Sequence, residues 1–181
     1  MKKNIFIAVL FSIVALVSFS SCESDDDYLV RSGLYCDFLS TSNNKGYFAS
    51  NGGGSYSFRD LPDLGYGDII GMEYRGTTLT ITGDIREGDV IRDLYISVQG
   101  VGDFLYASDI EVYKDYEKIV FNTSNDREFY NFMNDVMYKF YRDGRINIVV
   151  DGYITNYQGV GIGNVEMEIY LDSSLDVTVR R

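Results

Sequence analysis

The feature of this sequence that most limits its fold is a strict alternation of apolar and polar residues. The clearest run is 165–172, where the odd positions are Val, Met, Ile and Leu and the even positions are Glu, Tyr and Asp. Successive side chains of a strand point to opposite faces, so this pattern predicts a strand with one face on a core and one in water. Shorter runs with the same alternation occur at 34–38, 78–82, 94–98, 110–112, 119–121 and 175–179. Half-buried strands of this kind are typical of antiparallel sheets.

The segment 125–142 has a helical pattern instead, with apolar residues at steps of three and four. These residues are Phe129, Phe132, Met133, Val136 and Phe140. Asn125 is the expected N-cap, with Glu128 three positions later, and Gly144 is placed for a left-handed C-terminal cap. We therefore predict one late helix, packed over one end or face of the sheets.

Together these patterns predict an all-β fold in a single domain over residues 33–181. About ten strands and one helix favour an antiparallel β-sandwich, immunoglobulin-like in the loose architectural sense. A lipocalin-like β-barrel is the alternative, because its strands alternate in the same way and a late helix packs outside it. Four glycine-containing turn signals are expected to separate strands. They are Asn51-Gly52, Arg75-Gly76, Glu87-Gly88 and Asp151-Gly152.

Composition excludes several classes of function. The chain has no His, which rules out a Ser-His-Asp triad, a Cys-His pair and a His-ligated metal. Two cysteines cannot build a four-cysteine zinc site. A net charge of -11 and a pI near 4.3 argue against nucleic acid as a partner, because too few cations are available for phosphates. We predict no cofactor and no metal site.

The N-terminus has the organisation of an export signal. Lys2 and Lys3 precede an uncharged stretch, 4–21, whose apolar part, 5–17, is too short for a comfortable membrane span and has the shape of a secretory signal. It ends in Phe19-Ser20-Ser21-Cys22, which resembles the lipobox of bacterial lipoproteins, although Phe19 and Ser21 depart from the usual residues. This resemblance implies that 1–21 is a signal peptide and that Cys22 is acylated and becomes the first mature residue.

An acidic run follows Cys22 directly. It consists of Glu23, Ser24, Asp25, Asp26 and Asp27. This run resembles the export signal that sends lipoproteins of Bacteroidetes to the outer face of the outer membrane. The resemblance implies a protein held by acyl chains and facing the cell exterior. Residues 22–32 also have the composition of a solvated, self-repelling tether, and both interpretations can hold together.

Tyrosine is unusually common, with 16 residues that all follow the signal segment. Tyr95 and Tyr170 are expected to point outward because their strand neighbours face the core, and Tyr153 and Tyr157 precede the glycine-rich segment 159–164. Tyrosine rings stack on sugars and suit protein interfaces. The alternative is that tyrosine is present for its β-propensity, and the absence of Trp weakens the case for sugars.

The other motifs point to no chemistry. The segment 159–164 is expected to be a flexible hairpin loop, because a strand rather than a helix follows it. Cys36 is expected in the core. Acidic residues cluster at 60, 63 and 68 and again at 84, 87 and 89, which leaves calcium binding open.

We therefore predict a non-catalytic binding or accessory module for a glycan or an envelope protein. A structural or assembly component, or a protein inhibitor, is the alternative. A carboxylate-dependent hydrolase is a third and weaker hypothesis.

Overall fold

The described part of the protein in this computed structural model comprises residues 27–50, 54–57, 61, 67–114, 116–121 and 126–180. It contains ten strands and one long helix. In chain order they are β1 (Asp27–Thr41), β2 (Tyr47–Ala49), β3 (Gly54–Ser57), β4 (Asp68–Gly83), β5 (Val90–Val98), β6 (Gly102–Tyr106), β7 (Ile110–Glu111), β8 (Tyr116–Phe121), α2 (Arg127–Asp143), β9 (Arg145–Thr155) and β10 (Glu166–Arg180).

The strands form two separate antiparallel sheets, which confirms the predicted β-sandwich. The first sheet has the order β1-β10-β4-β8 and the second the order β2-β9-β5-β6, with β3 paired to β9 and β7 paired to β5. No pairing joins the two sheets in the described part of the chain, so the lipocalin-like closed barrel is not formed. The alternating apolar residues face one another between the sheets and make one continuous core.

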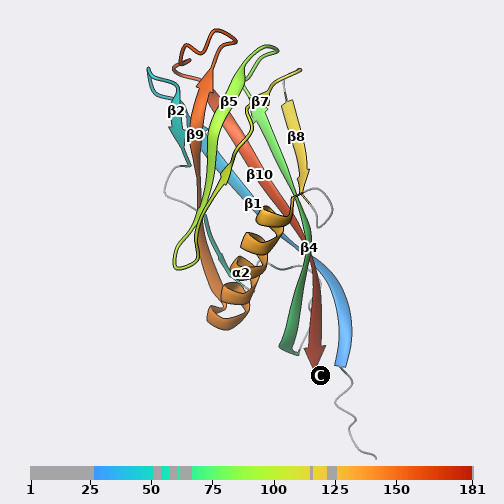
Figure 1. The fold of residues 1–181 in the computed structure, drawn as a ribbon. Helices are drawn as coiled ribbons and strands as arrows, with labels where there is room; N and C mark the ends of the chain where they lie inside the picture. Colours follow the sequence, from blue (N-terminus) through green and yellow to red (C-terminus); the bar gives the residue numbers. More distant parts are fainter. Residues whose placement is uncertain are drawn as a thin grey trace, which may run out of the picture.

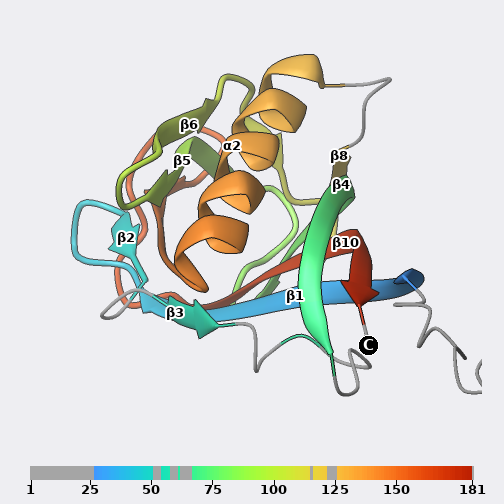
Figure 2. The ribbon, with the colours of Figure 1, turned by 90° about the horizontal axis from the view of Figure 1, so that it is seen from below.

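Helix α2 lies between β4 of the first sheet and β9 of the second (Figure 2). It begins one residue later than predicted, because Asp126 and not Asn125 is the N-cap; its carboxylate accepts from the Phe129 backbone N–H at 2.8 Å. Gly144 caps the other end in the left-handed conformation, as predicted. The fully buried Phe129 packs edge-on against Phe104 of β6, with 4.9 Å between ring centroids. The helix therefore fills the space between the two sheets.

Two of the four turn predictions are wrong, because the dipeptides concerned lie inside long strands. Arg75-Gly76 is part of β4, where Arg75 is the extra residue of a bulge opposite Ser174 and Leu175 of β10. Asp151-Gly152 is part of β9, opposite an irregularity in β5. A Cβ on Gly152 would approach the carbonyl oxygen of Arg92 to 3.1 Å, so glycine serves close strand approach at this site. The Glu87-Gly88 turn forms as expected between β4 and β5, and Asn51-Gly52 lies outside the described residues.

The first sheet extends well past the second at one end (Figure 1). Strand β1 begins at Asp27, six residues before the domain start predicted at position 33, because 27–32 pair with the end of β10. The runs at 165–172 and 175–179 are likewise one strand, β10. The signal segment, Cys22 and Glu23 to Asp26 lie outside the described residues. Asp27, the last residue of the acidic run, makes an ion pair with Arg180 at 2.9 Å.

Candidate functional site

Three of the four predicted tyrosines gather on one side of the molecule. Tyr95 of β5 and Tyr153 of β9 are exposed on the outer face of the second sheet, and Tyr157 stands in the β9–β10 connection at the end of that sheet. Tyr170 does not join them. It lies on β10 in the first sheet, stacked on Tyr35 with 5.7 Å between ring centroids, and donates a hydrogen bond to Glu168 that raises the pKa of its hydroxyl to about 12.

The outer face of the second sheet also exposes large side chains that the sequence analysis did not single out. We call its exposed large side chains the tyrosine face; they are Tyr47, Tyr95, Leu105, Val149 and Tyr153. The Tyr47 and Tyr153 rings are 5.3 Å apart and sit on directly paired residues of β2 and β9. Leu105 of β6 is the direct partner of Tyr95. Tyr47 was missed because only the strand register, which is a long-range property, brings it to this face.

Asp151 lies within the tyrosine face, directly paired with Tyr95. Partial burial raises the pKa of Asp151; a hydrogen bond from Tyr47 opposes this rise and the nearby Asp103 carboxylate adds to it. Burial also raises the pKa of the Tyr47 hydroxyl. Tyr47 therefore keeps its proton at neutral pH and remains a hydrogen-bond donor.

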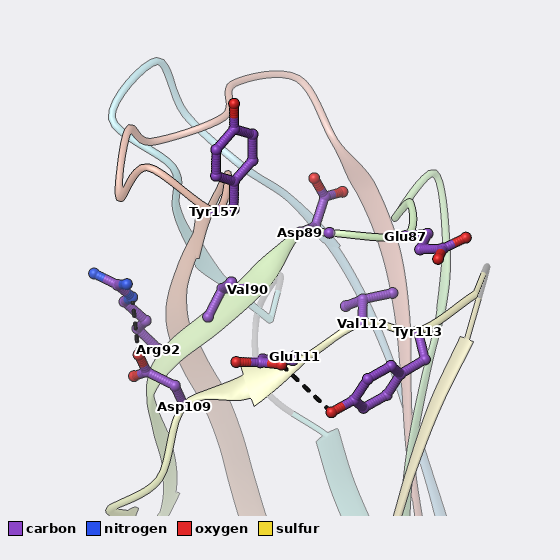
Figure 3. Close-up of a pocket in the computed structure, with 10 residues that line it drawn as sticks. Glu87, Asp89, Val90, Arg92, Asp109, Glu111, Val112, Tyr113 and Tyr157 are labelled. Carbon is purple, nitrogen blue, oxygen red and sulfur yellow. Dashed lines mark hydrogen bonds and ion pairs between the residues drawn. The ribbon is translucent and has the colours of Figure 1, made fainter.

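At one end of this face is a cavity of about 360 Å³, which we call the end pocket (Figure 3). It is formed by the β4–β5 turn, β5, β7 with the residues on either side of it, and the β9–β10 connection. Its lining side chains are Glu87, Asp89, Val90, Arg92, Asp109, Glu111, Val112, Tyr113 and Tyr157. Figure 3 shows the exposed rings of Tyr157 and Tyr113 on opposite sides of Val90 and Glu111. The cavity therefore combines aromatic sides and an apolar floor with carboxylates.

Two of the pocket carboxylates have partners within the pocket. The Tyr113 hydroxyl donates to Glu111 Oε2 at 3.4 Å, and Arg92 Nε lies 3.3 Å from Asp109 Oδ2. The Arg92 contact is an ion pair without hydrogen-bond alignment, since Nε is buried and makes no hydrogen bond among the described residues. Arg92 is also the strand partner of Tyr153, so the end pocket and the tyrosine face form one continuous surface.

The glycine-rich segment beside the pocket is held in place and is not the loose hairpin expected from its composition. The Asn156 side chain accepts from the backbone of Gln158 at 2.9 Å and Val160 at 3.0 Å, which forms a tight turn around Tyr157. Gly161 packs directly on the β1–β2 turn, where an added Cβ would lie 2.1 Å from the Lys45 carbonyl oxygen. The wall that carries Tyr157 is therefore ordered by backbone contacts.

The turn opposite Gly161 is anchored by Ser42. Its hydroxyl donates to the Ile162 carbonyl at 2.7 Å and accepts from the Val165 N–H at 3.0 Å. These bonds join the β1–β2 turn to the β9–β10 connection from both sides. The β1–β2 turn and the glycine-rich segment therefore have a structural task, which is to fix one wall of the end pocket.

The other sequence candidates remain separate from this site. Cys36 is buried in the core, as predicted. Asp84 lines a different cavity from Glu87 and Asp89, and Asp60 and Asp63 lie outside the described residues. Across the described part of the chain, no group of three or more Cys, Asp and Glu residues is arranged to hold a metal ion. None of the described helices is long and apolar enough to cross a membrane.

Comparison with known proteins assigns no family. No protein-family model matches the chain, and no curated protein matches its sequence. Among solved structures, the decameric BFDV capsid protein is similar with a TM-score of 0.39 and 10% identity, over 85% of this chain and 99% of that one. The infectious bursal disease virus Gx strain structure gives 0.33 and 15%, over 87% of this chain and 33% of that one. At these TM-scores the similarity does not assign a function.

Proposed function

We propose that this protein is a lipid-anchored surface protein whose β-sandwich is a non-catalytic module that binds a glycan. Acyl chains on Cys22 hold it in the outer membrane, facing the cell exterior. The observation that carries the binding proposal is the continuous surface formed by the tyrosine face and the end pocket. The lipobox resemblance and the acidic run after Cys22 support the anchor.

The chemistry of this surface fits a sugar chain. Tyrosine rings stack on the apolar faces of sugar rings, and carboxylate, guanidinium and hydroxyl groups bond to the sugar hydroxyls. The end pocket has the size of a small-ligand site. The tyrosine face extends it along β5 and β9 by way of Arg92 and Tyr153, which supports an oligosaccharide rather than a single sugar.

The charge of the pocket limits the class of glycan. Four lining carboxylates face one cation, Arg92, which already pairs with Asp109. The mature chain has 160 residues and a charge of 14 - 27 = -13. Like charges repel most strongly in a partly enclosed site. We therefore propose a neutral or amine-bearing oligosaccharide and not a uronate polymer.

Titration calorimetry of the soluble chain from residue 23 onward tests this proposal against neutral, amine-bearing and uronate oligosaccharides. Tyr157→Ala and Tyr153→Ala should each weaken binding by about five- to tenfold, which corresponds to about 1–1.4 kcal/mol of lost ring contact. Tyr138→Ala, at an exposed helix position outside the pocket lining, is the control and should bind normally. If no member of the panel binds, the glycan proposal is wrong. If only uronates bind, the proposed restriction to neutral or amine-bearing glycans is wrong.

A protein ligand is the second candidate for the same surface. Within the tyrosine face, Leu105 and Val149 provide aliphatic area that a sugar would not need. Aromatic and aliphatic side chains of this kind are typical of protein interfaces. Capture of one envelope protein by the wild type but not by Leu105→Glu, with no binding of sugars, would favour an assembly component over a glycan-binding module.

A further inference from the structure

The anchored end and the binding end of this domain lie at opposite ends of its longest strands. Strand β1 starts at Asp27, beside Arg180 near the end of β10. It runs to Thr41, where the β1–β2 turn packs against the β9–β10 connection that carries Tyr157. Figure 1 shows the start of β1 and the C-terminus together at one end, and the loops above β5 and β9 at the other.

The dimensions of the chain set how far apart these ends are. Strand β1 has 15 residues, which at about 3.3 Å per residue gives a length of about 45–50 Å. Between Cys22 and Asp27 the chain has five Cα steps, which span at most about 18 Å fully extended. The leash from an acylated Cys22 is therefore much shorter than the strand it leads into.

The end near Asp27 is a stiff part of the fold. Here 27–33, 68–75 and 174–180 form a three-stranded extension of the first sheet. The buried Asp176 carboxylate accepts from Arg75 at 2.7 Å, and Arg31 lies 3.8 Å from it on the other side. On the inner face of β10, Leu175, Val177 and Val179 have no exposed surface. This extension therefore acts as a rigid spacer between the leash and the sandwich.

Charge disfavours a domain lying flat on the membrane. The outer face of the first sheet presents Asp37, Glu168 and Asp172. The outer face of the second sheet presents Asp151 and the pocket carboxylates. Either face would bring several negative charges against an anionic surface, at a cost that grows within a Debye length of about 8 Å.

We infer that the acylated protein stands upright, with the end pocket at the membrane-distal end, about 45–65 Å from the anchor. The occupant of the pocket is then a glycan from the medium and not a headgroup of the membrane that carries the protein. This inference rests on the proposed anchor at Cys22. The three-stranded extension places the binding surface beyond the layer next to the membrane.

Energy transfer from the protein to the membrane tests this orientation. The mature chain from Cys22 onward, purified from membranes with its acyl chains shown by intact mass, is reconstituted in vesicles that contain an acceptor-labelled lipid. Donor dyes are placed on Asp68→Cys, at the Asp27 end, or on Val160→Cys, beside the end pocket. Both positions are exposed, and the native Cys36 is buried and does not compete for the dye.

We expect a large loss of donor fluorescence at position 68 and little loss at position 160. Equal loss at both positions would mean a flat domain, and greater loss at 160 would mean an inverted one; either result overturns the inference. A long Gly/Ser insertion before Asp25 should reduce the difference, since a longer leash releases the domain. Calorimetry on the soluble chain tests the glycan separately, so failure of the orientation leaves sugar binding intact. If Cys22 carries no acyl chain, the anchor and this inference fail together.

Discussion

Gly161→Ala is the substitution that most directly tests how the end pocket is held together. The backbone of Gly161 lies against the β1–β2 turn so closely that a Cβ would be 2.1 Å from the Lys45 carbonyl oxygen and 2.9 Å from the Gly46 nitrogen. Ordinary contact begins near 3.4 Å, so the two segments must separate by about 1.3 Å. Both obstacles are backbone atoms and cannot rotate away.

That separation breaks hydrogen bonds between the two segments, and the number of bonds lost sets the loss of stability in Gly161→Ala. The bonds at risk are those that join the two segments: Ile154 N–H to Gly46 O at 2.8 Å, Asn164 N–H to Ser42 O at 2.9 Å and the Ser42 hydroxyl to Ile162 O at 2.7 Å. Each contributes about 0.5–1.5 kcal/mol net, so their loss destabilises the fold by about 2–4 kcal/mol. For a domain of this size, a fall in Tm of about 5–15 °C follows.

Scanning calorimetry measures this effect, with Gly33→Ala as the matched control. Gly33 lies in β1 with ordinary space around it, its nearest contact being the Ser173 carbonyl oxygen at 3.5 Å. There Ala should be neutral or stabilising by up to about 1 kcal/mol, because it restricts the unfolded chain. If Gly161→Ala melts within about 2 °C of the wild type, the close packing of these loops is wrong, and with it the preorganised wall that carries Tyr157.

Three further substitutions test the core, the cap and the tyrosine face. Phe129→Ala removes a fully buried ring from the helix and should cost about 3–5 kcal/mol in urea unfolding, whereas the exposed Tyr138→Ala should change stability little. Asp126→Ala removes the N-cap and should cost about 1 kcal/mol, with loss of helical circular dichroism at lower temperature. Asp151→Asn should raise Tm at pH 7, because the pKa of Asp151 is higher in the folded protein, so its ionised form is disfavoured there. This gain should vanish below about pH 4, where the wild-type carboxyl is protonated and resembles the amide.

Patterns within short stretches of sequence correctly predicted the buried face of β10 and the position of helix α2. The alternation at 165–172 and 175–179 has a single parity, and β10 buries the odd positions throughout. The helix between Asp126 and Gly144 was predicted to within a residue or two because its stripe and caps are local signals. Each of these features follows from side-chain direction within one element.

What could not be predicted depends on register and on contacts between distant segments. A polar residue followed by glycine is a turn signal, but Asp151-Gly152 lies inside a strand. There it faces an irregularity of β5 that includes Asp93, whose backbone is in the left-handed conformation. The pairing of 27–32 with the end of β10 could not be inferred from the acidic composition just before it. The pairing of Tyr47 with Tyr153 also depends on β2 joining β9, so the candidate site was only partly predicted.

The two tyrosine pairs of this fold separate β-propensity from binding. Tyr47 with Tyr153 and Tyr35 with Tyr170 are both cross-strand or diagonal ring contacts on outer sheet faces, but only the first pair adjoins the end pocket. Valine has comparable β-propensity and no ring to stack on a ligand. If the tyrosines are present only for their β-propensity, Tyr153→Val and Tyr170→Val should both bind the ligand as tightly as the wild type. If the tyrosine face binds the ligand, Tyr153→Val should weaken binding by about five- to tenfold while Tyr170→Val binds normally and melts within about 2–4 °C of Tyr153→Val. Equal affinity in the two variants would mean that the exposed tyrosines are strand formers, and the ligand surface would have to be sought elsewhere.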